Sequence, residues 1–204
     1  MNEKQTWSEN VILADADYVD KVAFNLIVNF ERMLGRRIPQ ADMARWAECI
    51  ALDGGLREKP AAAEGDTETA GQETHVVLVH DHRSDAMANF EPGSYAELNG
   101  KAFRGPLGEF TFTATSTEGL APKDELFADT LQMLTAESGV KRLMVVPDET
   151  QYNKVREILR RSSTQQAVTV FAMQPIAGGP FMQEILGYSL MAALGIRSDE
   201  IKPN

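Results

Sequence analysis

Four aspartates stand where they could together hold a metal ion. Asp15 and Asp17 follow the apolar run "VILA", Asp148 follows "RLMVVP", and Asp124 falls in the first turn of a helix expected from Pro122. Ligands of open parallel sheets bind beyond the carboxyl ends of the strands, so we expect these side chains to meet at one edge. Clustered carboxylates repel unless a cation lies between them, and their oxygens suit Mg²⁺ or Mn²⁺. The sequence therefore predicts a candidate Mg²⁺ or Mn²⁺ site that could activate water for phosphodiester hydrolysis.

The same aspartates also fit a purely structural interpretation. Asp and Glu are favoured at helix N-termini, where they cap free amides and complement the helix dipole. We expect Asp17 to cap the first helix, and Glu125 and Glu149 to serve in the same way. Asp15 and Asp148 remain open between the two interpretations, because each directly ends an expected strand.

Other chemical signals in the sequence are weaker. The segment His80-Asp81-His82 places two imidazoles on one side of an extended chain, but no spacing indicates a third ligand, and a solvent-exposed loop is favoured. The sequence has no G-x-S-x-G elbow, no G-x-G-x-x-G fingerprint and no phosphate-binding G-x-x-x-x-G-K-[ST] loop. The single cysteine, Cys49, has apolar neighbours and is expected to be an inert buried thiol.

The elements that would position these residues alternate along the chain. Apolar runs predict strands at residues 11–14, 75–80, 141–147 and 167–173, and the alternation over residues 108–116 predicts a half-exposed strand near a sheet edge. Helical periodicity predicts helices from Asp17 to Gly35, after Pro39, and over residues 122–137, 150–161 and 181–194. This alternation is typical of an α/β three-layer sandwich, Rossmann-like in layout, with a mostly parallel sheet of about five strands and helices on both faces.

Composition limits the organisation and the partners. Residues 1–204 are expected to form a single α/β domain, and residues 57–74, which lack large apolar side chains, to form a flexible insertion loop. The formal net charge of −10 disfavours broad charge-driven binding to nucleic acid or an anionic membrane. No apolar run is long enough for a membrane span. The polar N-terminal stretch shows no targeting signal, so a cytoplasmic location is expected.

Two long segments carry a resemblance to other proteins. "WSENVILADADYVDKVAFNLIVNFERMLGRRIP" and "VTVFAMQP…EILGYSLMAALGIRSDE" make the chain look like an uncharacterised bacterial family, a domain of unknown function found in gut anaerobes. This resemblance implies no activity.

A remote resemblance to PIN-like nucleases, especially the NYN branch, covers roughly residues 10–173. In the family, an aspartate ends the first strand, as in "VILADAD", and an acidic residue opens a later helix, as in "GLAPKDELFADTLQML" with Asp124 or Asp129. The family's S-G-D-x-D-[FY] motif corresponds to "VPDETQY", where Asp148 matches the first aspartate and Thr150 replaces the second. The resemblance therefore implies a PIN-like fold with a degenerate nuclease site.

Two functions remain open at this stage, and with them the question of whether the protein is an enzyme. The first is a non-catalytic or regulatory module that works through a protein partner or as a homo-oligomer, supported by the missing second aspartate and the acidic composition. The alternative is a PIN-like ribonuclease that depends on Mg²⁺ or Mn²⁺ and uses Asp15, Asp124 and Asp148 on RNA.

Overall fold

The computed structural model describes residues 6–59, 71–162 and 165–201. The helices are α1 (Ala16–Leu34), α2 (Met43–Asp53), α3 (Tyr95–Leu98), α4 (Lys123–Ala136), α5 (Tyr152–Arg161) and α6 (Leu186–Ala193), with 3₁₀ turns η1 (Glu149–Gln151) and η2 (Ser198–Glu200). The strands are β1 (Asn10–Asp15), β2 (Ala41–Asp42), β3 (Glu73–Val79), β4 (Phe90–Glu91), β5 (Ala102–Gly105), β6 (Gly108–Thr115), β7 (Arg142–Val146), β8 (Ala167–Ala172) and β9 (Met182–Ile185).

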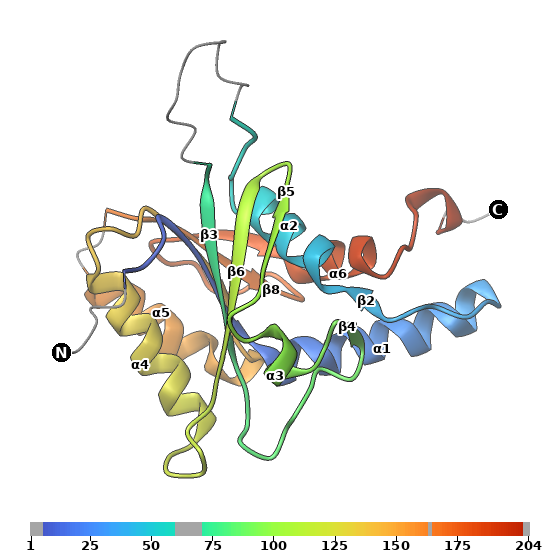
Figure 1. Ribbon diagram of the computed structural model, residues 1–204, viewed down its shortest axis with the longest axis horizontal. Coiled ribbons are helices and arrows are strands. Elements are labelled where there is room, and N and C mark those ends of the chain that lie inside the picture. Colours follow the sequence, from blue (N-terminus) through green and yellow to red (C-terminus); the bar gives the residue numbers. More distant parts are fainter. Residues whose placement is uncertain (1–5, 60–70, 163–164, 202–204) are drawn as a thin grey trace.

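The main sheet has the order β5-β6-β3-β1-β7-β8-β9 and is parallel except for β5, which runs antiparallel to β6 (Figure 1). The predicted α/β class with a mostly parallel sheet is confirmed, but the expected number of about five strands is too small. The missed strands β5 and β9 have four residues each, "AFRG" and "MQEI", and neither is a continuous apolar run. Because β9 occupies the start of the predicted last helix, α6 begins only at Leu186.

Helices cover both faces of the sheet, and two separate apolar cores result. Ile12 and Ala14 of β1 point into the core that α1, α2 and α6 share, whereas Val11 and Leu13 point into the core beneath α4 and α5. A strand buried on both faces needs an apolar residue at every position, which explains the uninterrupted run that ends at Asp15. The predicted three-layer arrangement with helices on both faces is thus present.

The chain changes direction across the sheet between β1 and β7. From β1 it passes through α1 and α2 to β3 on one side, and from β6 it returns through α4 to β7 on the other side of β1. In open α/β sheets such a switch point opens a crevice at the carboxyl ends of the strands, where ligands usually bind. Asp15 is the last residue of β1, and Asp148 follows shortly after β7.

Two helix starts differ from the prediction. Asp15, not Asp17, caps α1, because its Oδ1 accepts a hydrogen bond from the Tyr18 amide at 3.0 Å. The second helix does not open at Pro39. Instead, the short strand β2 pairs with β4 first, and Asp42 then caps α2 by accepting from the Arg45 amide. At the other end of α1, the Gly35 C-cap is confirmed, with a φ of 64°.

The predicted insertion loop at residues 57–74 falls mostly on residues 60–70, which lie outside the described residues, and β3 already includes Glu73 and Thr74. None of the helices in the described parts of the chain combines the length and the apolar character needed to cross a bilayer.

Candidate functional site

A buried ion pair occupies the switch point. The Asp15 side chain is 1% exposed, and its Oδ1 accepts a hydrogen bond from Nζ of Lys123 at 2.7 Å. Lys123 is the first residue of α4, which lies on the sheet face opposite α1. The pair therefore joins the end of the central strand β1 to the start of α4. The same Oδ1 also caps α1 through the Tyr18 amide.

Asp17 belongs to the same cluster. Its Oδ2 lies 3.4 Å from Lys123 Nζ and accepts a hydrogen bond of 2.7 Å from the Asp81 amide. Its Oδ1 accepts from the Tyr95 hydroxyl at 3.5 Å. One ammonium group therefore lies between two carboxylates and offsets part of their repulsion. We call Asp15, Asp17 and Lys123 the lysine cluster.

Lys123 is held in its charged form. Burial by itself lowers the pKa of Lys123, but the hydrogen bond and charge of Asp15, together with Asp17, outweigh it and raise this pKa above its ordinary value. Burial raises the pKa of Asp15, and the hydrogen bond and charge of Lys123 oppose that rise. Lys123 therefore stays an ammonium at neutral pH and is not a nucleophile.

Asp124 and Asp148 take part in a second network. Gln151 Nε2 donates to Asp124 Oδ2 at 3.0 Å. Asp148 Oδ1 accepts from both the amide and the hydroxyl of Thr150, at 2.8 Å each, and so caps the turn η1. Thr150, which the remote resemblance matched to the second aspartate of the PIN-like motif, thus donates a hydrogen bond to Asp148.

The structure brings all four predicted aspartates to the carboxyl end of the sheet, but it divides them. Asp15 and Asp17 share Lys123, while Asp124 and Asp148 bind Gln151 and Thr150. Among residues 6–59, 71–162 and 165–201, no three His, Cys, Asp or Glu side chains are grouped so that they could hold a metal ion.

The histidines near this edge are occupied by other contacts. The His80 ring stacks on Tyr95, with centroids 3.8 Å apart, and its Nδ1 lies 2.9 Å from the Asp81 carbonyl oxygen. His82 Nδ1 lies 3.6 Å from Asp81 Oδ1. Contacts of the two histidines therefore stabilise the loop at residues 80–82, beside the lysine cluster. Tyr95 links this loop to Asp17.

The sequence patterns did not predict Lys123 or Tyr95, which both contact Asp17. A lysine in the first turn of a helix opposes the helix dipole, which makes Lys123 an unusual choice and the one signal that could have drawn attention to it. Cys49, expected to be buried, is partly exposed. The partial burial of its thiol raises the pKa of this group, which disfavours the reactive thiolate.

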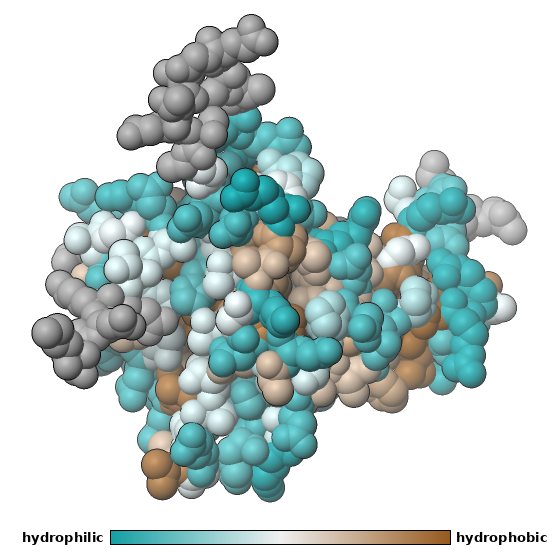
Figure 2. Space-filling model, viewed as in Figure 1, coloured by the Kyte–Doolittle hydropathy of each residue, from teal (hydrophilic) through white to brown (hydrophobic). Residues whose placement is uncertain are grey.

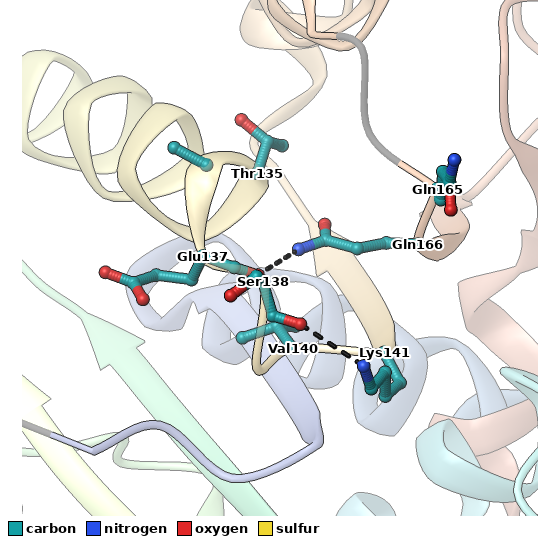
Figure 3. A pocket seen from close by; sticks show the side chains of 8 residues that line it. Thr135, Glu137, Ser138, Val140, Lys141, Gln165 and Gln166 are labelled. Carbon is teal, nitrogen blue, oxygen red and sulfur yellow. Dashed lines mark hydrogen bonds between the residues drawn. The ribbon is translucent and has the colours of Figure 1, made fainter.

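A hollow of about 540 Å³ lies at the opposite edge, between the end of α4 and the start of β7 (Figure 3). Its polar groups serve the fold. Gln166 Nε2 donates to the carbonyl oxygens of Leu134 and Glu137, and Lys141 Nζ donates to that of Ser138. Such bonds satisfy the free carbonyls at a helix end, so the hollow is explained by helix capping.

Fold and site define a three-layer α/β protein in which two aspartates at the switch point share one lysine. The chain belongs to a family of unknown function, DUF6621, whose model matches residues 4–201. No curated protein and no solved structure matches it. The expected membership of an uncharacterised family is confirmed. The bacterial gut origin and the resemblance to PIN-like nucleases stay predictions.

Proposed function

We propose that this protein is a non-catalytic or regulatory α/β module, with a degenerate PIN-like site, that acts through a protein partner. The observation that carries the proposal is the position of Lys123, whose Nζ lies 2.7 Å from Asp15 Oδ1 and 3.4 Å from Asp17 Oδ2. The lysine supplies the positive charge that a catalytic metal ion would supply in an active nuclease.

Displacing this ammonium would be unfavourable. A divalent ion bound by Asp15 would have to displace Lys123, whose side chain is only 18% exposed, and would break the hydrogen-bonded pair between them. Breaking a buried pair by removing one partner costs roughly 3–5 kcal/mol. The intact pair therefore opposes metal binding at this end of the sheet.

The second network supports the same interpretation. The alternative function, a Mg²⁺- or Mn²⁺-dependent ribonuclease, requires Asp15, Asp124 and Asp148 to share one ion. Each of the three carboxylates instead has its own protein partner: Lys123, Gln151 and Thr150 respectively.

The test is an RNA-cleavage assay with the full chain, using labelled single-stranded RNA and millimolar Mg²⁺ or Mn²⁺. We expect no metal-dependent cleavage. Cleavage by the wild-type chain that disappears in both Asp15→Asn and Asp148→Asn would contradict the proposal and support the ribonuclease. Glu157→Gln, a change at an exposed residue of α5 outside both networks, is the matched control.

A further inference from the structure

One edge of the main sheet ends in an exposed strand. β5 pairs with β6 on one side and is the terminal strand of the sheet order. Ala102 and Arg104 are exposed. In Figure 1 the β5–β6 hairpin lies beside α2. An open strand edge offers unpaired amides and carbonyls to another chain.

The hydrogen-bond pattern identifies which groups of β5 face outward. The Phe112 amide donates to the Lys101 carbonyl, whereas the Glu109 amide turns away from β5 and donates to the Gln72 carbonyl. Antiparallel pairs alternate between bonded and non-bonded positions. With the observed register, the amide and carbonyl groups of Ala102 and Arg104 therefore point away from β6.

An apolar cavity of about 370 Å³ lies directly beside this edge. Its wall and floor include the buried side chains of Met43, Leu98 and Phe112. Phe103 of β5 adds a partly buried ring, stacked on Phe110 with centroids 4.9 Å apart. Figure 2 shows brown hydrophobic atoms next to teal hydrophilic ones in the region where Figure 1 draws β5 and α2.

The charged groups around the cavity are mainly acidic. Glu91 and Glu97 line it together with one cation, Lys101. Glu48 of α2 lies against Gly105 at the other end of β5, where burial raises the pKa of its carboxyl. Arg104, on β5 itself, pairs with Glu109 at 3.1 Å. The surface therefore combines an apolar hollow with a net negative rim.

We propose that the β5 edge and its cavity bind an extended peptide segment of a partner protein, with an apolar side chain flanked by basic residues. The peptide adds to β5 as a further strand and bonds the outward groups of Ala102 and Arg104. Its apolar side chain fills the cavity, and its cations face Glu91 and Glu97. Main-chain pairing supplies affinity in this mode of recognition, and pockets supply specificity. This inference rests on the proposed function and names the surface and the partner class.

The test is a selection from a displayed library of random decapeptides on the immobilised full chain, followed by fluorescence polarisation with the enriched peptides. Ala102→Pro removes one outward amide and leaves the β5–β6 bonds in place, because Pro is tolerated on an edge strand. Ala102→Ser keeps the amide and is its control. Glu97→Lys reverses a rim charge, and Asp129→Lys reverses a charge on the opposite layer.

We expect enriched peptides that combine an apolar residue with Lys or Arg. Ala102→Pro and Glu97→Lys should each weaken their binding about tenfold or more, while the two controls change it little. No enrichment, or enriched peptides that bind Ala102→Pro as tightly as the wild type, would overturn the inference. So would a wild-type dimer in sedimentation that Ala102→Pro dissociates, because a second copy would then occupy the edge. None of these results depends on RNA cleavage, so this inference and the proposed function can fail separately.

Discussion

Lys123 Nζ donates to Asp15 Oδ1 across 2.7 Å and so ties the first residue of α4 to the last residue of β1. The contact joins two layers of the sandwich at the switch point, and Asp15 is 1% exposed. It is therefore a structural tie, and under the proposed function it is also the contact that a metal ion would have to displace to bind Asp15.

Replacing the lysine tests the structural side of this contact. Lys123→Met leaves the buried Asp15 carboxylate without a cation, and we expect the free energy of unfolding to fall by about 3 kcal/mol. Urea denaturation at neutral pH measures it. Lys154→Met, an exposed lysine of α5, should change stability by less than about 0.5 kcal/mol.

The double variant separates the pair from its surroundings. Asp15→Asn retains a side-chain oxygen for the Tyr18 amide but removes the charge. We expect the double variant, Lys123→Met with Asp15→Asn, to lose clearly less stability than the sum of the two single losses. Once one partner of the ion pair has been replaced, replacing the other has no ion pair left to break. Additive losses would show that the two charges do not stabilise each other.

Thr150 gives a prediction for the second network. Thr150→Asp removes the hydroxyl that donates to Asp148 and places a like charge beside it. We expect a loss of about 1 kcal/mol at neutral pH that shrinks with added salt, because salt screens the repulsion. Thr150→Asn, which adds no charge, should show no such salt dependence. Equal salt responses in the two variants would count against this account.

His75 predicts a pH effect on stability. Its Nε2 lies 2.6 Å from Thr113 Oγ1, and burial lowers its pKa below the ordinary 6.5. Between the lowered folded pKa and 6.5, the unfolded chain binds more protons, so this contribution is complete above 6.5 and is lost as the pH falls. From about pH 7.5 to about pH 5.5, thermal denaturation should show a smaller loss for His75→Gln than for the wild type. If the denaturation temperatures of the wild type and His75→Gln fall in parallel as the pH is lowered, the pH effect does not come from His75.

Gly108 makes the β5–β6 hairpin possible. Its φ is +112°, and an added Cβ would collide with the Gln72 carbonyl oxygen. Gly108→Ala should lower stability by roughly 2 kcal/mol and speed hydrogen exchange of the β5 amides. Gly139→Ala, where a Cβ meets nothing within 4 Å, is the control and should leave β5 exchange unchanged.

The parts of the fold that the sequence predicted are those in which burial dictates residue type. β1 and β7 are buried on both faces, so each contains an unbroken apolar run, at residues 11–14 and 143–146. The edge strands β5 and β9 are short and partly exposed, and nothing in "AFRG" or "MQEI" requires a strand. Their pairing is fixed by tertiary contacts that a local pattern does not contain.

The candidate site follows the same division. Strand ends placed Asp15 and Asp148 at one edge, and a helix start placed Asp124 near them. The partner of each carboxylate depends on the side-chain geometry of Lys123, Thr150 and Gln151. The positions of charged residues along the chain do not predict this geometry. A single ammonium thus changes the interpretation of the predicted residue set, which stays a prediction as a functional site.

The most direct test of the lysine cluster is a calorimetric titration of Mn²⁺ into the wild-type chain, with Asp15→Asn and Asp148→Asn in parallel. If Lys123 occupies the place of a metal ion, the wild type will show no saturable binding up to millimolar Mn²⁺, and the three titrations will be alike. Saturable binding in the wild type that is lost in both variants would contradict this account and establish a shared metal site.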